Sequence, residues 1–258
     1  MADDDNSGFT HWAKEVKYKF CGEDICLVQD PSSHVLGSTV WDSAKCFMMF
    51  LEKNVCDFDA ELMAKKRKKP CVSVCELGAG LGLAGIALAK RGFHVVVTDL
   101  APVLPWLKEN VELNFTAAER QRVVVVEYAW GTPTTALEGV VNHAPPFDII
   151  LCADVLYEAA CVKPLVKSIL ALSTRKTIVY IANERRAPAI REEFMKYLNA
   201  YFVWKHVPQE DLHQDYIKDS MEVFEARRKH TKTPVPMQIL DTDEVGPQDG
   251  LLHCEYNS

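Results

Sequence analysis

Glu76-Leu77-Gly78-Ala79-Gly80-Leu81-Gly82 is the stretch of this 258-residue chain that decides its fold. It ends the short apolar run 71–77, which is typical of a buried strand, and leads into residues 81–91, whose pattern favours a helix closed by Gly92. A strand that turns through glycines into a helix gathers bare backbone and free amide groups at one spot. The sequence therefore predicts a ligand-binding turn here, at the carboxyl end of the strand.

The pattern that follows this turn repeats strand and helix along the chain. Such alternation is typical of a parallel sheet covered by helices on both faces, and the nearly unbroken apolar strands fit burial on both sides. We therefore expect an α/β fold, a seven-strand Rossmann-like sandwich that is mostly parallel with a late antiparallel strand. The expected strands are 93–98, 123–126, 148–152, 177–182, 201–207 and 221–226, and the expected helices are 102–114, 159–172 and 188–198.

The residues before this domain favour a smaller N-terminal unit. Residues 15–28 predict a β-hairpin with a four-residue turn at Cys21-Gly22-Glu23-Asp24, and 41–54 carry apolar residues at helical spacing. The basic run Lys65–Lys69 is interpreted as a solvated connector; it also fits a nuclear localisation signal or a nucleic-acid patch. The expected divisions are a flexible 1–12, a hairpin, helix and connector over 13–70, the main domain over 71–228 and a disordered tail over 229–258.

The glycine turn fits two kinds of ligand. The spacing Gly80-x-Gly82-x-x-Gly85, with Asp99 further on, satisfies the fingerprint of a dinucleotide site. In that site, however, the first glycine directly follows the strand, whereas here Glu76 and Gly78 occupy the corner. A carboxylate at Glu76 suits the cationic amino group of methionine and would repel a pyrophosphate. The order acidic-x-Gly-x-Gly-x-Gly also resembles the turn of methyltransferases, and the turn is therefore interpreted as an S-adenosylmethionine site.

Two further positions point to the rest of the same cofactor. Asp99 ends the second strand of the domain, where a carboxylate can accept hydrogen bonds from both ribose hydroxyls; the alternative is a helix cap. Trp130 follows the third strand, where its ring could cover the adenine or belong to the core.

Ala153-Asp154-Val155-Leu156-Tyr157 stands at the end of the fourth strand, where this fold presents the donor methyl group. A carboxylate and a phenol can grip and orient an amine, and methyl transfer needs mainly positioning and exclusion of water. We expect Asp154 and Tyr157 to carry the reaction. The alternative is a helix cap for Asp154 and ordinary packing for Tyr157.

Together these landmarks resemble methyltransferase family 16, the small seven-strand protein-lysine methyltransferases with the class I fold. The resemblance covers roughly residues 35–228 and includes the segment Asn183-Glu184-Arg185-Arg186. It implies transfer of methyl groups to a lysine of a chaperone-like ATPase, a heat-shock protein or an elongation factor. It also implies cofactor contacts from Trp41, Glu76, Gly78, Ala79, Gly80, Asp99, Leu100, Trp130 and Ala153, with Asp154 and Tyr157 facing the acceptor lysine.

Composition and charge indicate which binding partners and locations to expect for the chain. A net charge of −7 disfavours nucleic-acid binding, and no apolar run is long enough to cross a bilayer. The nine cysteines lack metal-site spacing and are interpreted as reduced core thiols, with no metal expected. We expect a cytoplasmic monomer, with a nuclear location possible through Lys65–Lys69. A small-molecule amine methyltransferase and a catalytically silent adaptor are the rival functions.

Overall fold

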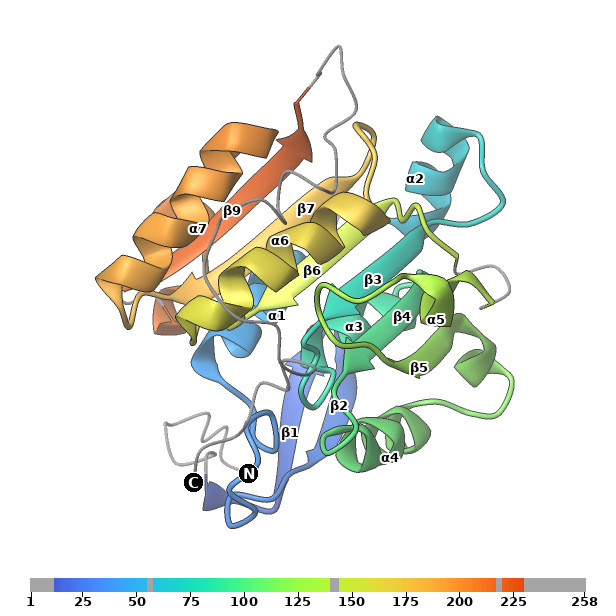
Figure 1. Cartoon of the computed structure of the whole chain (residues 1–258). Coiled ribbons are helices and arrows are strands. Elements are labelled where there is room, and N and C mark those ends of the chain that lie inside the picture. Colours follow the sequence, from blue (N-terminus) through green and yellow to red (C-terminus); the bar gives the residue numbers. More distant parts are fainter. Residues whose placement is uncertain (1–11, 55–57, 140–143, 217–219, 230–258) are drawn as a thin grey trace.

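A seven-stranded sheet forms the centre of the molecule (Figure 1). The computed structural model describes residues 12–54, 58–139, 144–216 and 220–229. The strands lie in the order β5-β4-β3-β6-β7-β9-β8, and only β9 runs antiparallel to its neighbours. They are β3 (Ser73–Leu77), β4 (His94–Asp99), β5 (Val123–Glu127), β6 (Ile149–Ala153), β7 (Ile178–Glu184), β8 (Phe202–His206) and β9 (Met221–Arg228). This confirms the expected fold class, including the late antiparallel strand.

Helices cover both faces of this sheet (Figure 1). Because β3, β4 and β6 are mostly apolar and buried on both sides, each face needs its own cover. One buried cluster joins the sheet to α1 (Asp42–Lys53), α3 (Leu83–Lys90) and α4 (Leu104–Asn114). The other joins it to α5 (Thr135–Glu138), α6 (Ala159–Leu172) and α7 (Pro188–Tyr201). Single-turn helices lie at Glu119–Arg122, Gln209–Asp211 and Gln214–Tyr216.

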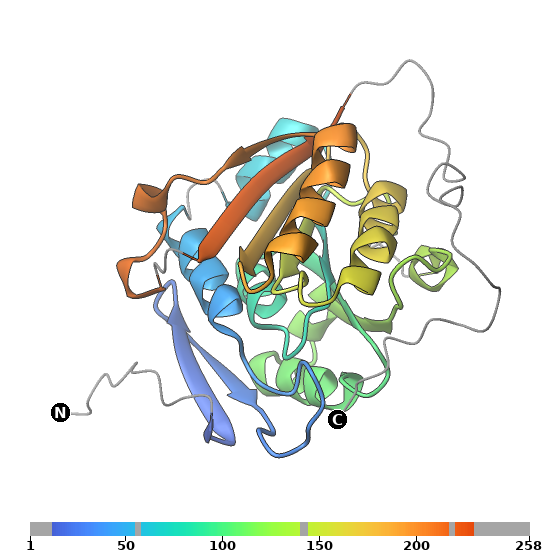
Figure 2. The same cartoon turned by 60° about the vertical axis from the view of Figure 1, so that its left-hand side comes forward.

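The N-terminal hairpin is a separate two-stranded sheet of β1 (Glu15–Phe20) and β2 (Glu23–Val28), which stands apart from the main sheet in Figure 2. The predicted four-residue turn is wrong. Phe20 pairs with Glu23, so the loop is only Cys21-Gly22, and both loop residues have positive φ, 52° and 82°. This left-handed pair matches the twist of the strands and closes the hairpin two residues earlier.

Two asparagines of α4 dock the hairpin on the main domain. The Asn110 side chain accepts a hydrogen bond from the amide of Val28 at 2.7 Å and donates to its carbonyl at 3.1 Å. Asn114 forms the same pair of bonds with Cys26, at 3.0 and 2.6 Å. The edge of β2 is therefore paired by side-chain amides instead of by another strand.

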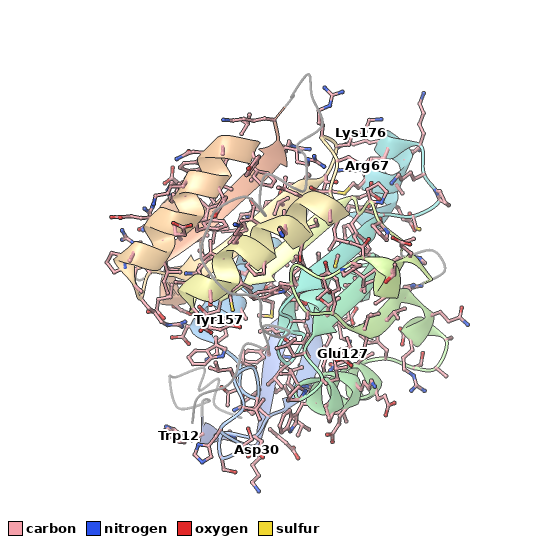
Figure 3. The ribbon with its side chains drawn as sticks, viewed as in Figure 1. Trp12, Asp30, Arg67, Glu127, Tyr157 and Lys176 are labelled. Carbon is pink, nitrogen blue, oxygen red and sulfur yellow. The ribbon has the colours of Figure 1, made fainter. Side chains whose placement is uncertain are left out.

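The basic run is not a simple solvated connector. Its first part belongs to α2 (Ala60–Arg67), a helix that the sequence does not reveal because it lacks an apolar stripe. Arg67 and Lys69 both contact the buried carboxylate of Asp148, at 3.0 and 2.7 Å. In Figure 3, Arg67 lies beside Lys176 at the end of the sheet opposite to Glu127 and Tyr157. Through these ion pairs the run is attached to the amino end of β6.

The described residues bear on the expectations about membrane spans, metal sites and cysteines. None of their helices is long and apolar enough to span a bilayer. They contain no group of His, Cys, Asp or Glu side chains arranged to hold a metal ion. The seven cysteines among them are free, but only four are buried, and Cys26 is exposed. The expected tail lies almost wholly outside the described residues.

Candidate active site

The glycine turn between β3 and α3 has the left-handed backbone that its sequence predicts. Gly78, Gly80 and Gly82 have φ of 67°, 55° and 83°. At Gly78 a side chain is also excluded by packing, because a Cβ would lie 2.7 Å from Cζ2 of Trp130. At Gly80 the nearest atom to a Cβ would be the carbonyl oxygen of Gly37, at 3.4 Å. The turn thus exposes backbone between Trp130 on one side and the Gly37 loop on the other.

Asp99 closes the edge of this turn. Its two carboxylate oxygens accept hydrogen bonds from the amides of Gly80, at 2.7 Å, and Leu100, at 2.8 Å. Burial raises the pKa of Asp99 to about 6, and these two bonds oppose the rise. A hydroxyl or cationic ligand at this edge would relieve the same electrostatic cost.

Glu76 lies beneath the turn, and its orientation differs from the simple picture of a carboxylate facing the ligand. Only 1% of it is exposed, and one of its oxygens accepts a hydrogen bond from the amide of Gly85 at 2.8 Å. A Cβ at Gly85 would lie 2.5 Å from that oxygen and 2.5 Å from Val97. The last glycine of the fingerprint therefore makes room for Glu76 and for helix–sheet packing. The sequence did not reveal this contact.

Burial of Glu76 predicts a pH-dependent stability. Burial raises the pKa of Glu76 from 4.5 to about 8, with a further rise from Asp99 and opposition from the Gly85 amide. Between these values the folded chain keeps a proton that the unfolded chain has lost. The free energy of unfolding should then fall by about 1.4 kcal/mol for each pH unit in this window.

Urea unfolding without cofactor at pH 5, 7 and 9 measures this effect. Glu76→Gln removes the ionisation, so we expect it to be close to wild type at pH 5 and more stable at pH 9. Equal slopes of stability against pH in the two proteins would contradict the assignment. Asp99 contributes a smaller fall, confined to the window between 3.8 and about 6, in both proteins.

Trp130 and Tyr157 connect the glycine turn to the end of β6. Their ring centroids are 6.3 Å apart with the planes tilted by 48°. The Tyr157 side chain is 37% exposed at the carboxyl end of the sheet (Figure 3). The ring of Trp130 lies against both the glycine turn and Tyr157, so the two predicted parts of the site adjoin.

Asp154 follows β6 in a strained backbone conformation, with φ of 60°. Its amide donates to the carbonyl of Ala182 on β7 at 2.8 Å, which fixes the corner. Its carboxylate, only 5% exposed, accepts two hydrogen bonds from Arg186, at 2.8 and 2.7 Å. Arg186 also reaches Glu184 at 3.2 Å. The candidate catalytic carboxylate is therefore already held by an arginine.

Trp41 covers this ion pair. The guanidinium carbon of Arg186 lies 4.8 Å from the centre of a Trp41 ring, within the range of a cation–π interaction. Trp41 caps the start of α1, and the loop before it includes Gly37, which lies against Gly80 and Val103. The N-terminal unit thus brings one side chain to the Asp154–Arg186 pair and a loop to the glycine turn.

The predicted site residues gather at one edge of the sheet. β3, β4 and β6 are adjacent and parallel, so their carboxyl ends meet there. Arg186 also lies at this edge, bonded to Asp154. Its role in the site was not predicted from the sequence, although its segment, Asn183-Glu184-Arg185-Arg186, forms part of the family resemblance. The predicted residues at this edge are Trp41, Glu76, Gly78, Ala79, Gly80, Asp99, Leu100, Trp130, Ala153, Asp154 and Tyr157.

Comparisons with known proteins agree with one another. The sequence profile of the family described as "Lysine methyltransferase" matches residues 21–201. Protein N-lysine methyltransferase METTL21A of Mus musculus is 30% identical over 200 residues, which cover 76% of this chain and 84% of the relative. EEF1A lysine methyltransferase 3 of Mus musculus is 28% identical over 190 residues, 72% of this chain and 73% of the relative.

A comparison of structures supports the fold alone. The glycopeptide N-methyltransferase MtfA, in a crystal structure with sinefungin, superposes with a TM-score of 0.50. The match covers 78% of this chain and 99% of that protein at 11% identity. At such low identity the match shows that the sheet and its helices are shared, and it says nothing about individual site residues.

Proposed function

This chain belongs to the lysine methyltransferase family and uses S-adenosylmethionine as its cofactor, and from this premise we propose that it methylates the side-chain amine of a lysine in a partner protein. The observation that carries the proposal is the junction of the glycine turn with the Asp154 corner through Trp130 and Tyr157. A chaperone-like ATPase, a heat-shock protein or an elongation factor is the partner class that we expect.

The residues of the turn fit a cationic nucleoside. Gly80 leaves backbone bare beneath the Gly37 loop, and two carboxylates, the buried Glu76 and the half-buried Asp99, have raised pKa values. A positive charge nearby would favour their ionised forms. A pyrophosphate would instead add negative charge beside two acids, which disfavours the dinucleotide reading of the same glycines.

We assign the cofactor contacts as follows. The carboxylate of Asp99 would accept hydrogen bonds from the ribose hydroxyls, with Leu100 beside it. Trp130 would lie against the adenine. Glu76 would act on the methionine amino group by its charge from beneath the turn, because its side chain is buried and bonded to Gly85. Backbone contacts would come from Gly78, Ala79, Gly80 and Ala153, and Trp41 would close the site.

Asp154 and Tyr157 would position the acceptor. When bound, the cofactor supplies an electrophilic methyl group: as the N–C bond forms, the C–S bond breaks, its electron pair stays on sulfur and the positive charge passes to nitrogen. The lysine must therefore lose its proton before the transfer. The Tyr157 hydroxyl can orient the lone pair, and the rings of Trp41 and Trp130 can limit the access of water.

Labelling of an extract tests the proposal. Extract from cells that lack this protein is incubated with the purified chain and tritiated S-adenosylmethionine, then separated on a gel. We expect a labelled protein band whose hydrolysis yields methyl-lysine and whose mass spectrum identifies the modified position. Asp154→Ala protein, added at the same concentration, is the control and should give no band.

Two other outcomes would contradict the proposal. Label confined to small molecules would support a metabolite amine methyltransferase. A chain that binds neither the cofactor nor its demethylated product by calorimetry would be an adaptor that retains the fold.

The remaining expectations belong to the same proposal. We expect a cytoplasmic monomer without nucleic-acid partners, which size-exclusion chromatography and cell imaging can check. In keeping with this, Arg67 and Lys69 of the basic run are engaged with Asp148.

A further inference from the structure

The carboxylate of Asp154 poses a problem for lysine methylation. An isolated ionised carboxylate beside the acceptor would favour the ammonium form of the lysine, which has no lone pair to react. The structure shows that this carboxylate is not isolated. Both of its oxygens are bonded to the guanidinium of Arg186, at 2.8 and 2.7 Å.

This pair has the features of a fixed arrangement and not of a loose surface contact. The bonds are bidentate, which is the strongest geometry for arginine and carboxylate. Asp154 is 5% and Arg186 36% exposed in their side chains, and Trp41 lies 4.8 Å from the guanidinium. The amide of Asp154 is itself tied to Ala182. A carboxylate has about four lone-pair sites, so two remain for an acceptor amine.

The other charged and titratable groups around this corner come from several elements. Glu184, at the end of β7, shares Arg186 at 3.2 Å and accepts a bond from Ser220 at 3.2 Å. Tyr157 stands on the loop after β6 and is followed by Glu158, an exposed residue. α1 begins with Asp42, whose carboxylate pairs with Lys45 at 3.2 Å. Among these groups of the described chain, Arg186 is the cation bonded to Asp154.

We infer that Arg186 is a positioning residue of the reaction, which neutralises Asp154 and orients it so that Asp154 can hold the acceptor lysine by a hydrogen bond while the lysine gives up its proton. The inference rests on the proposed function. Arg186 itself acts through Asp154 and Trp41, and the proton leaves to solvent.

The pH dependence of kcat tests the inference. The acceptor is the protein purified from the labelled band, at saturating cofactor. In Arg186→Gln the charge of Asp154 is no longer balanced, so the lysine in the complex should hold its proton more tightly. We expect the acid limb of kcat to move up by about one pH unit, which is about a tenfold loss below the limb and recovery above it.

Two variants control for the change of side chain. Arg186→Lys keeps a positive charge but loses the bidentate guanidinium and its contact with the Trp41 ring. The acid limb of its kcat profile should therefore stay near the wild-type pH even if kcat is lower. Arg185→Gln removes the neighbouring positive charge, which lies 3.9 Å from Glu222, and should leave the profile unchanged. A profile of Arg186→Gln that coincides with wild type, or a loss equal at every pH, would overturn the inference.

A second measurement needs no acceptor protein. It distinguishes failure of the Arg186–Asp154 pairing from failure of the proposed function. In a double-mutant cycle of Arg186→Gln and Asp154→Asn on urea unfolding, the double variant should lower the folding equilibrium constant no more than the worse single variant. Additive effects would refute the pairing even if labelling succeeded. A coupled pair without any labelled protein would refute the proposed function and leave the pairing intact, while a retained profile on a labelled protein would refute the neutralising role alone.

Discussion

Gly80→Arg protein is expected to show no S-adenosylmethionine binding by calorimetry, a loss of at least about 100-fold in affinity. The residue has a φ of 55°, its amide donates to Asp99 at 2.7 Å, and a side chain there would begin 3.4 Å from the carbonyl oxygen of Gly37. A long cationic chain would fill the space that the cofactor needs and place a positive charge beside Asp99. A 100-fold loss corresponds to roughly 2.7 kcal/mol of binding free energy.

Two variants separate this effect from backbone strain. Gly80→Ala adds only a Cβ, 3.4 Å from the nearest atom, so its strain of about 1–2 kcal/mol should lower the stability of the fold without abolishing cofactor binding. Gly22→Arg makes the same replacement at the hairpin loop, where φ is 82° and no atom lies within 4 Å of a Cβ. It should bind the cofactor like wild type. Binding retained in Gly80→Arg would show that the turn is not the cofactor site.

Asp154→Ala is expected to abolish methyl transfer while the cofactor still binds. The substitution removes the carboxylate that we propose faces the acceptor, and it leaves Arg186 without its bidentate partner. We expect kcat to fall by roughly 10²–10³-fold, the size found when one preorganised polar group is removed from an active site. Turnover on the labelled protein and calorimetry with the cofactor measure the two effects separately.

Asp154→Asn is the matched control for the backbone. Asp154 has φ of 60°, a conformation that asparagine tolerates and alanine resists. If loss of activity came only from strain at this corner, Asn would restore it. If the charge is needed, both variants are inactive and both bind the cofactor. Near-native turnover in Asp154→Ala would show that this residue is not part of the chemistry.

The sequence predicted the elements well where the pattern was local. Helix α6 was expected over 159–172 and lies at Ala159–Leu172, because its apolar residues recur at helical spacing. It failed for α2, where Ala60 and Ala64 are the only buried positions and the helix is set by an Asp59 cap and by ion pairs with Asp148. The Asp59 cap is local, but Asp148 lies 81 residues from Arg67, so that ion pair leaves no local pattern.

The site shows the same division. The positions of Gly78, Asp99 and Asp154 at strand ends follow from the order of strands and turns, which the sequence contains. The bonds of Glu76 to Gly85 and of Asp154 to Arg186 do not, because they depend on which face of a strand or which neighbouring loop a side chain meets.

By itself the sequence determined the sheet, the glycine turn at its carboxyl edge and the family, because these depend on residue types at fixed spacing along one stretch of chain. Only the tertiary structure decided that Arg186 lies over the ring of Trp41 and forms an ion pair with Asp154. These three residues come from the start of α1, the end of β6 and the loop after β7, and only the packing of α1 and the pairing of β6 with β7 bring them within bonding distance. The charge balance at the acceptor corner is therefore a property of the folded chain.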